Sequence, residues 1–241
     1  MLPIRDTIRS RSFPIVNYTL IGINTAIFLF EITMPDRLLE RLIYTFGMVP
    51  ARLPLFEPWR FLTSPIAVIS LFTHMFLHGG WVHFLSNMWT LFIFGDNVED
   101  RMGSLRFLLF YLLGGLAAAF TQAFIDPSSR VPAIGASGAI AAVMGAYFLL
   151  FPNAKVITLV PLFFMPYFVE ISAFFFLGVW FVTQFFSGVA SLLSPAQISM
   201  GGIAWFAHIG GFAFGFLTVK LFTPRRPLPY VRVYPDEYFP W

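Results

Sequence analysis

AIGASGAIAAVMGAYF, residues 133–148, opens with a polar serine between glycines and then becomes almost purely apolar. Ser137 is the polar residue, with Gly135 before it and Gly138 after it. The chain around this segment shows which solvent it faces. It is 58% hydrophobic and only 11% charged, with a mean hydropathy of +0.77. Such a chain cannot cover itself with the charged surface of a soluble domain, so its main solvent is expected to be a lipid bilayer.

Long apolar runs are spread along most of the chain, which predicts one membrane domain, residues 15–222, with short tails at 1–14 and 223–241. A helix that crosses about 30 Å of hydrocarbon rises about 1.5 Å per residue. Six runs are candidate crossings on this basis: 15–33, 81–95, 104–125, 137–151, 168–193 and 202–222. The predicted fold class is therefore an all-α, polytopic bundle of six transmembrane helices.

Residues 34–80, between the first two predicted spans, are amphiphilic and rich in proline. They are expected to form an interfacial loop with short helices, because proline interrupts a spanning helix. The chain has no cysteine, which excludes disulfides, thiol nucleophiles and cysteine-ligated metals. Its net charge of +3 comes from cations at segment ends, which is typical of membrane anchoring and does not predict a nucleic-acid partner.

The distribution of Lys and Arg predicts the orientation of the bundle, because cytoplasmic loops carry an excess of these residues. With both termini cytoplasmic, the inner side holds Arg5, Arg9, Arg11, Arg101, Arg106, Lys155, Lys220, Arg225, Arg226 and Arg232. The outer side then holds Arg37, Arg41, Arg52, Arg60 and Arg130. Both termini are therefore expected to be cytoplasmic, and the second, fourth and sixth spans run inward from the outer face.

Three polar residues are expected at one depth below the outer face. The second and fourth predicted spans are short, which predicts a depression filled with water. His208 lies six residues past Gly202, and Asn87 lies six residues past Trp81. If the fourth span begins below the surface because it is short, then Ser137, His208 and Asn87 share a level.

Each of these residues also has a structural interpretation. A serine at the start of a helix usually caps it, and glycine beside it usually permits a turn or close packing. A histidine inside a transmembrane helix is costly, which favours a functional cavity. Gly211 and Gly215 have the spacing that lets a neighbouring helix approach, and such packing could bring Ser137 to His208.

This grouping suits nucleophilic attack on a carbonyl group. Neutral imidazole can remove the proton of a serine hydroxyl, which is otherwise a weak nucleophile. No Asp or Glu lies in the fourth or sixth predicted span, so a Ser137–His208 dyad is more economical than a triad. The amides of Ser137 and Gly138 at a helix N-terminus, with His83 and Asn87 four residues apart on one helical face, could hold the developing oxyanion.

These motifs together resemble the rhomboid family of intramembrane serine proteases. The resemblance covers roughly residues 15–222 and rests on GASG at 135–138, AHIGGFAFG at 207–215 and HMFLHGGWVHFLSN at 74–87. It implies that Ser137 is the nucleophile and His208 its base. It also implies that His83 and Asn87 lie on the oxyanion side, with no cofactor.

The resemblance further assigns residues to structural roles. His78 is expected to brace the loop at 34–80, and EDRMG at 99–103 resembles a family element in which Glu99 and Arg101 are structural. Trp59-Arg60 resembles a motif near the membrane surface. Gly135, Gly211 and Gly215 are expected to permit a turn and close packing.

Two positions depart from the family pattern. The family often has an aromatic residue one turn after the nucleophile, stacked on the histidine, where this chain has Ala141. The spacing from Trp59-Arg60 to His74 is also longer than the family pattern, which predicts a reshaped loop. The dyad residues themselves are present.

The resemblance implies a substrate and a location. The substrate would be a single-span membrane protein, cut near the outer face at a small residue after local unwinding of its helix. The fifth span and its loop would form the lateral entry. The chain would be a multi-pass protein of the cell (inner) membrane, with lipid around it and an active site open to the outer face.

Two other functions remain open on the sequence. His74, His78 and His83 offer three imidazoles for a membrane metal protein, although no acidic residue lies beside them and no H-E-x-x-H motif occurs. A catalytically silent relative could instead bind and route membrane proteins. The presence of both Ser137 and His208 favours catalysis.

Overall fold

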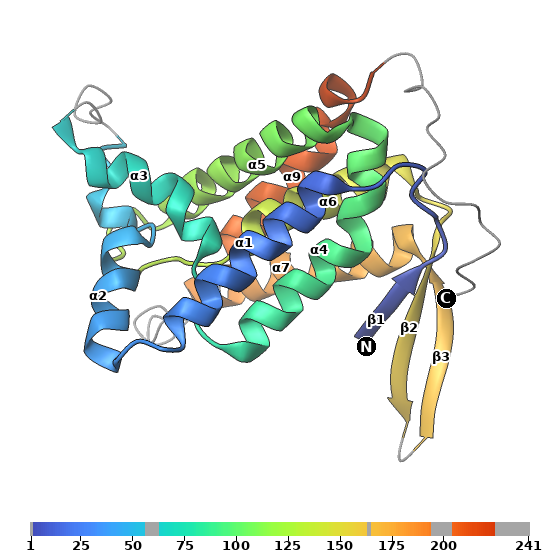
Figure 1. Cartoon of the computed structure of the whole chain (residues 1–241), viewed down its shortest axis with the longest axis horizontal. Helices are drawn as coiled ribbons and strands as arrows, with labels where there is room; N and C mark the ends of the chain where they lie inside the picture. Colours follow the sequence, from blue (N-terminus) through green and yellow to red (C-terminus); the bar gives the residue numbers. More distant parts are fainter. Residues whose placement is uncertain (1, 56–62, 163–164, 194–203, 225–241) are drawn as a thin grey trace.

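The protein is a bundle of long helices with a small sheet at one end, seen in the computed structural model in Figure 1. The structure describes residues 2–55, 63–162, 165–193 and 204–224. The long helices are α1 (Ile15–Glu31), α4 (Trp81–Met102), α5 (Ser104–Ile125), α6 (Ser137–Leu150), α7 (Ala173–Leu192) and α9 (Trp205–Phe222). Helix α6 is central, because it packs against α4, α5, α7 and α9 and is buried continuously from Gly138 to Tyr147.

Short helices join α1 to α4, as expected for the loop at 34–80. They are α2 (Asp36–Phe46), η1 (Pro50–Arg52), α3 (Pro65–Thr73) and η3 (His74–Phe76). Glu31 ties the end of this loop to α1, since its carboxylate accepts the His78 backbone N–H at 3.1 and 3.3 Å. The predicted Trp59-Arg60 motif lies outside the described residues.

The all-α prediction was wrong at one end of the molecule. Strands β1 (Leu2–Asp6), β2 (Lys155–Leu162) and β3 (Met165–Ser172) form an antiparallel sheet in the order β1-β2-β3. Residues 168–172 of the predicted fifth span therefore belong to β3, and the helix begins only at Ala173. An apolar run rich in β-branched and aromatic residues fits a strand as well as a membrane-spanning helix. Here the pairing with β2 makes these residues a strand.

The helix ends can be compared with the limits of the predicted spans. Helix α5 has the predicted ends, whereas α4 continues to Met102 and is 22 residues long, so the second span is not short. Only α6, with 14 residues, is as short as predicted. Helix α9 begins at Trp205, and residues 202–203 and 225–241 lie outside the described residues.

Among the described residues, α5, α7 and α9 are each long and apolar enough to cross a membrane. A fourth candidate is the pair Pro65–Phe76 and Trp81–Met102, which is bent by 80°. Helices α1 and α6 are apolar but shorter. The protein is therefore an integral membrane bundle, and the six spans with cytoplasmic termini stay a prediction.

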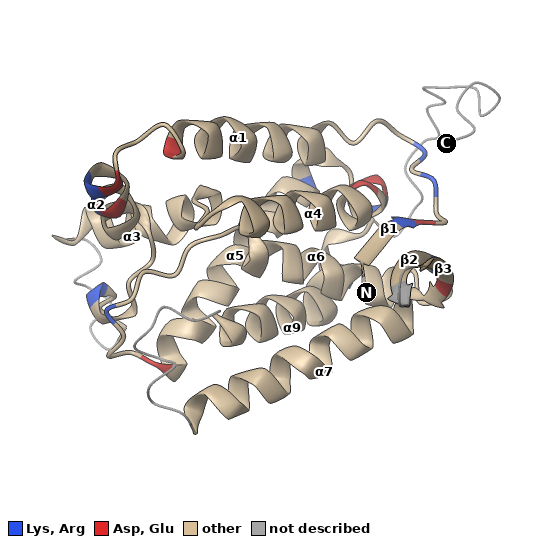
Figure 2. Cartoon of the chain, turned by 90° about the horizontal axis from the view of Figure 1, so that it is seen from below, with Lys and Arg blue, Asp and Glu red and all other residues tan. Residues whose placement is uncertain are grey.

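Charged side chains gather at the two ends of the bundle and leave its middle free of them (Figure 2). Large apolar side chains are exposed along the same helices, for example Phe186 at 66% and Leu221 at 82%. Burying a charge in hydrocarbon is costly, whereas exposing a leucine to lipid is not. The uncharged middle is the surface expected to contact lipid.

Glycines let α6 and α9 pack backbone to backbone. A Cβ on Gly211 would collide with the carbonyl oxygen of Gly138, and one on Gly215 would collide with that of Ala142. From the other side, a Cβ on Gly145 would collide with the carbonyl oxygen of Phe212. Small residues at such a crossing bring two membrane helices close together. This packing holds the start of α6 beside α9.

Asp6 anchors β1 to the bundle. Its carboxylate accepts hydrogen bonds from the Tyr147 hydroxyl of α6 and, at 2.8 Å, from Asn97 Nδ2 of α4. Burial raises the pKa of Asp6 from its ordinary 3.8 to about 6, against the lowering effect of the Tyr147 hydrogen bond. The folded state therefore binds this proton more tightly than the unfolded chain does.

The raised pKa of Asp6 predicts a pH dependence of stability. Because the folded value exceeds the unfolded one, stability is expected to fall as pH rises from about 4 to about 6. Asp6→Asn keeps an acceptor oxygen but cannot ionise, so it should flatten this part of the curve. Unfolding midpoints in detergent between pH 4 and 7 would measure it, with exposed Asp36→Asn as the control. Equal slopes for wild type and Asp6→Asn would contradict the prediction.

Candidate active site

Ser137 is the first residue of α6, and its side chain does not cap the helix. The N-cap residue is Ala136, and the first ladder bond runs from Ile140 N to Ala136 O at 2.9 Å. Gly135 just before it has φ +119, a conformation that favours glycine, and its N–H donates to His74 O at 2.8 Å. The turn thus directs the Ser137 hydroxyl into the bundle instead of back onto its own helix.

His208 of α9 lies beside this hydroxyl. Its Nε2 is 2.8 Å from Ser137 Oγ, and its Nδ1 is 2.7 Å from Gln184 Oε1 of α7. A carbonyl oxygen only accepts, so Nδ1 must carry the proton of the neutral ring. Nε2 is then left with a lone pair that faces the serine hydroxyl. This is the arrangement that a general base requires.

Gln184 was missed in the sequence analysis. It is the amide in an otherwise apolar stretch, FLGVWFVTQFF at 176–186, and its side chain is only 7% exposed. A polar side chain at membrane depth is a functional signal by itself. That signal could have identified Gln184, but nothing local in the sequence links it to His208, which is 24 residues away.

His83 and Asn87 of α4 both face Gly135. An ideal Cβ on Gly135 would lie 2.6 Å from His83 Nε2 and 3.5 Å from Asn87 Nδ2, so the missing side chain leaves room for both. The Gly79 N–H donates to His83 Nδ1 at 3.4 Å, which leaves the proton of a neutral ring on Nε2. Asn87 Nδ2 is buried and has no hydrogen-bond partner among the described residues. Two donors therefore point to the turn before Ser137.

The backbone adds further donors at this place. The first N–H groups of a helix have no partner within it, and the helix dipole is positive there. In α6 these include the amides of Ser137 and Gly138, which precede the first ladder donor, Ile140 N. The four predicted oxyanion residues thus lie on two elements, α4 and the start of α6, on either side of the Gly135 turn.

The imidazole ring of His208 has aromatic neighbours, but they are not on α6. The ring centroid of Trp180 in α7 is 5.8 Å away and tilted by 35°, and that of Trp205 in α9 is 6.3 Å away and nearly perpendicular. Ala141, where the family often has an aromatic, is fully buried and packs toward Gly211. The space for an aromatic ring on α6 is occupied by the close approach of α9.

A cavity of about 1040 Å³ contains the site. Ser137, His208, His83 and Asn87 line it together. Away from them, its walls are residues of α4, α6 and α7 and the start of β1: Trp89, Phe94, Met144, Phe176, Trp180, Leu2 and Pro3. The Trp89 indole N–H donates to Pro3 O at 2.6 Å, which holds β1 against α4. The cavity is therefore a groove that leads from the serine between α4 and α7.

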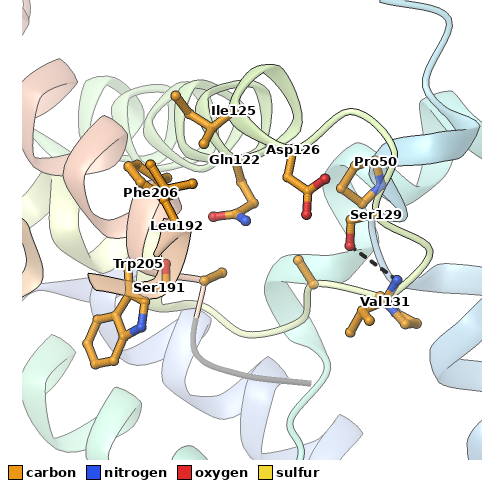
Figure 3. A pocket seen from close by; sticks show the side chains of 13 residues that line it. Pro50, Gln122, Ile125, Asp126, Ser129, Val131, Ser191, Leu192, Trp205 and Phe206 are labelled. Atoms are coloured by element: carbon orange, nitrogen blue, oxygen red, sulfur yellow. Dashed lines mark hydrogen bonds between the residues drawn. The ribbon is translucent and has the colours of Figure 1, made fainter. Parts of the chain in front are cut away.

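A smaller pocket of about 110 Å³ is drawn in Figure 3. It shares wall residues with the groove, including Val131 and Ala204. Gln122, Asp126, Ser129 and Ser191 give it polar walls. Gln122 Oε1 also accepts the Ala207 N–H at 3.3 Å, next to His208. Polar walls of this kind can hold water.

The predicted structural residues differ in their surroundings. Glu99 is 2% exposed and accepts from Val16 N, Asn17 N and Ser104 Oγ, so it joins α1, α4 and α5. Arg101 is exposed and makes no side-chain hydrogen bond within the described ranges. The His78 ring is buried between Phe28 and Phe84, and its backbone N–H is held by Glu31.

The three histidines of the metal alternative are not arranged as one ligand set. His74 Nδ1 is 3.0 Å from Ser70 O, and the His78 ring centroid is 5.2 Å from that of His83. Within the described part of the chain, no three His, Cys, Asp or Glu side chains gather as they would around a metal ion.

Known proteins resemble this chain over most of its length. The sequence matches the rhomboid domain over residues 57–225. Rhomboid protein 1, mitochondrial, of Saccharomyces cerevisiae is 27% identical over 83% of this chain and 51% of its own length. RHOMBOID-like protein 6, mitochondrial, of Arabidopsis thaliana is 30% identical over 66% of this chain and 42% of its own length. Rhomboid-like protease 5 of Toxoplasma gondii is 32% identical over 61% of this chain and 16% of its own length. The chain spans about half or less of these relatives.

Proposed function

The chain belongs to the rhomboid family, and on that premise we propose that it is an intramembrane serine endopeptidase in which Ser137 attacks and His208 is the base. The distance of 2.8 Å between Ser137 Oγ and His208 Nε2 is the observation that carries this proposal. The relative from Toxoplasma gondii is named a protease, which supports it.

Attack begins with proton transfer. As Ser137 Oγ bonds to the substrate carbonyl carbon, its proton passes to His208 Nε2, and the imidazole becomes charged. The same proton then goes to the nitrogen of the leaving peptide as the C–N bond breaks. No carboxylate lies on α6 or α9 to stabilise the charged ring, so the Gln184 oxygen at Nδ1 takes that position.

The negative charge that develops on the carbonyl oxygen needs donors already in place. The amides of Ser137 and Gly138, Asn87 Nδ2 and His83 Nε2 are the candidates. Asn87 Nδ2 supports this role, because it is buried without a partner in the described part of the chain, and such a group is costly unless a ligand accepts its hydrogen bond.

Water must then hydrolyse the acyl-enzyme. His208 Nε2 can remove a proton from that water as it did from serine. The source of this water in the proposal is the polar pocket lined by Gln122, Asp126 and Ser129, since it shares walls with the groove that holds Ser137.

The substrate proposed is a single-span membrane protein that enters between α4 and α7. A transmembrane helix hides its carbonyls in its own hydrogen bonds, so the segment must unwind before attack. The groove is walled by apolar Phe94, Met144 and Phe176 and ends at the polar site, which suits such a segment. With both termini cytoplasmic, the site opens toward the outer face of a cell membrane.

The test is cleavage by the purified full chain in detergent or proteoliposomes. A single-span protein with a small residue near its outer end should yield two fragments, located by mass spectrometry, and both should be absent when Ser137 is replaced by alanine. No fragment above background from a panel of such substrates, with folded protein, would overturn the proposal and favour a silent rhomboid relative.

Replacing Asn87 tests the oxyanion donors. Asn87→Ala is expected to lower kcat by about 10- to 1000-fold with little change in KM, because its amide acts only as charge develops. The other donors remain, so activity should persist. Leu85→Ala is the control on the same helix, since its side chain is 54% exposed and does not line the cavity. Equal kcat for Asn87→Ala and wild type would remove Asn87 from the oxyanion site.

A further inference from the structure

We propose that Gln184 of α7 is the positioning residue that fixes the tautomer and orientation of His208, an inference that rests on the proposed function. Gln184 Oε1 lies 2.7 Å from His208 Nδ1, on the opposite side of the ring from Ser137. The side chain is 7% exposed, and it belongs to the helix that forms one wall of the substrate groove.

The orientation of the Gln184 amide follows from its own neighbours. The Thr183 hydroxyl donates to Trp180 O at 2.6 Å, so its oxygen is free to accept. Gln184 Nε2 donates to that oxygen at 3.4 Å. The amide nitrogen is thereby directed to Thr183, and the amide oxygen to His208. An oxygen at Nδ1 selects the tautomer in which Nε2 lacks a proton and can accept the one from serine.

Helix α7 also supports the face of the ring. Trp180, one turn before Gln184, lies 5.8 Å from His208 between ring centroids. The family's frequent aromatic support one turn after the nucleophile is absent here, because Ala141 packs where α9 comes close. The same helix thus supplies both the hydrogen bond and the aromatic neighbour of the base.

The position of Gln184 depends on how α7 packs against α9. Phe181 stacks on Phe212 with ring centroids 4.6 Å apart, and a Cβ on Gly188 would meet Ile209 and Phe206 at 3.4 Å. These contacts lie on either side of Gln184 along the helix. A displacement of α7 away from α9 would remove the acceptor from Nδ1, so the base is fully oriented only while α7 is docked.

Two substitutions separate positioning from packing. Gln184→Met nearly keeps the volume but removes the strong acceptor, and it is expected to lower kcat by about 10- to 100-fold while KM changes little. Gln184→Glu restores an acceptor oxygen and should recover most of kcat. In Gln184→Glu, the acid limb of the plot of kcat against pH should move to higher pH, because a carboxylate at Nδ1 stabilises the protonated ring of His208. Among the described residues, His83 is the titratable group that acts on His208 electrostatically, and it is unchanged in both variants.

The experiment compares wild type, Gln184→Met, Gln184→Glu and the lipid-facing control Val182→Ala, all as the full chain in detergent. Val182 is 49% exposed, so its replacement should leave kcat unchanged. The rate of Ser137 acylation by a fluorophosphonate gives a second measure that needs no protein substrate, and it should fall in Gln184→Met by the same factor as kcat. Unfolding midpoints and gel filtration check that each variant is folded.

The outcomes distinguish the two proposals. Wild-type cleavage that depends on Ser137, with kcat and acylation unchanged in Gln184→Met, would overturn the role of Gln184 and leave the protease intact. An equal loss of kcat in Gln184→Met and Gln184→Glu, with the wild-type pH profile kept in both, would also overturn the role of Gln184. Restoring an acceptor oxygen would then have had no effect. Absence of any Ser137-dependent activity in wild type would overturn the proposed function itself.

Discussion

Ser137→Ala is expected to abolish peptide-bond cleavage, by about 10³-fold or more, while the protein stays folded. The substitution removes the only atom proposed to bond to the substrate, and nothing in the oxyanion site can replace a nucleophile. Its structural cost should be small, because the Ser137 side chain does not cap α6 and the helix start is held by the Gly135–His74 bond. Cleavage of a single-span substrate and the unfolding midpoint measure the two effects.

His208→Ala should give a loss of the same order, because serine and base act as one unit whose effects are not additive. The double variant should therefore be no worse than either single one. A mechanism-based serine acylator should add mass to the peptide that contains residues 135–138, and only when His208 is intact. A chelator should change neither cleavage nor labelling.

Two results would reject the dyad. One is wild-type turnover by a well-folded Ser137→Ala protein. The other is chelator-sensitive activity with stoichiometric zinc and no adduct on Ser137. That result would favour a catalytic metal site made by His74, His78 and His83. Intact and digested mass spectra, with metal content measured on the same sample, decide between them.

Gly215→Val is expected to prevent folding or to lower the unfolding midpoint severely. A Cβ at this position would collide with the carbonyl oxygen of Ala142, an atom of the backbone of α6 that cannot turn away as a side chain could. The two helices would have to separate, and with them Ser137 and His208. Overpacking of a close-packed interior costs about 1–3 kcal/mol, and forcing backbones apart costs more.

The matched control is Gly22→Ala. Gly22 also lies in an apolar helix, α1, but a Cβ on it would meet no atom within 4 Å. Its replacement should leave stability unchanged or slightly raised, since alanine is the better helix former. The yield of monodisperse protein in detergent and the unfolding midpoint compare the two. A Gly215→Val protein as stable as Gly22→Ala would contradict the close packing of α6 and α9.

The helices could largely be read from the sequence because their signal is local. The ends of helix α5 coincide with the limits of a predicted span, and α1, α6 and α9 begin or end within a few residues of such limits. Ser137 and His208 could be singled out for a similar reason, since polar residues in an apolar segment are costly and conspicuous. These inferences need only the residues of one segment at a time.

Local pattern did not distinguish a strand from the start of a span at 168–172, where the apolar composition fits both. This segment became a strand because it pairs with residues 155–162, and those residues pair in turn with the start of the chain. The second pairing joins residues about 150 positions apart, which no local pattern reveals. The extension of α4 to Met102 likewise crosses charged residues, among them Glu99, whose carboxylate is satisfied by α1 and α5.

By itself, then, the sequence determined that this is a membrane bundle and which side chains could carry serine chemistry, because hydropathy and the cost of buried polar groups act residue by residue. Only the tertiary structure decided which of them meet. It set Ser137 Oγ 2.8 Å from His208 Nε2, turned Asn87 and His83 to Gly135, and gave His208 an acceptor from Gln184. Those distances depend on glycines that bring α6 and α9 into backbone contact and on α7 packed against them, and such packing is set by the shapes of several helices together.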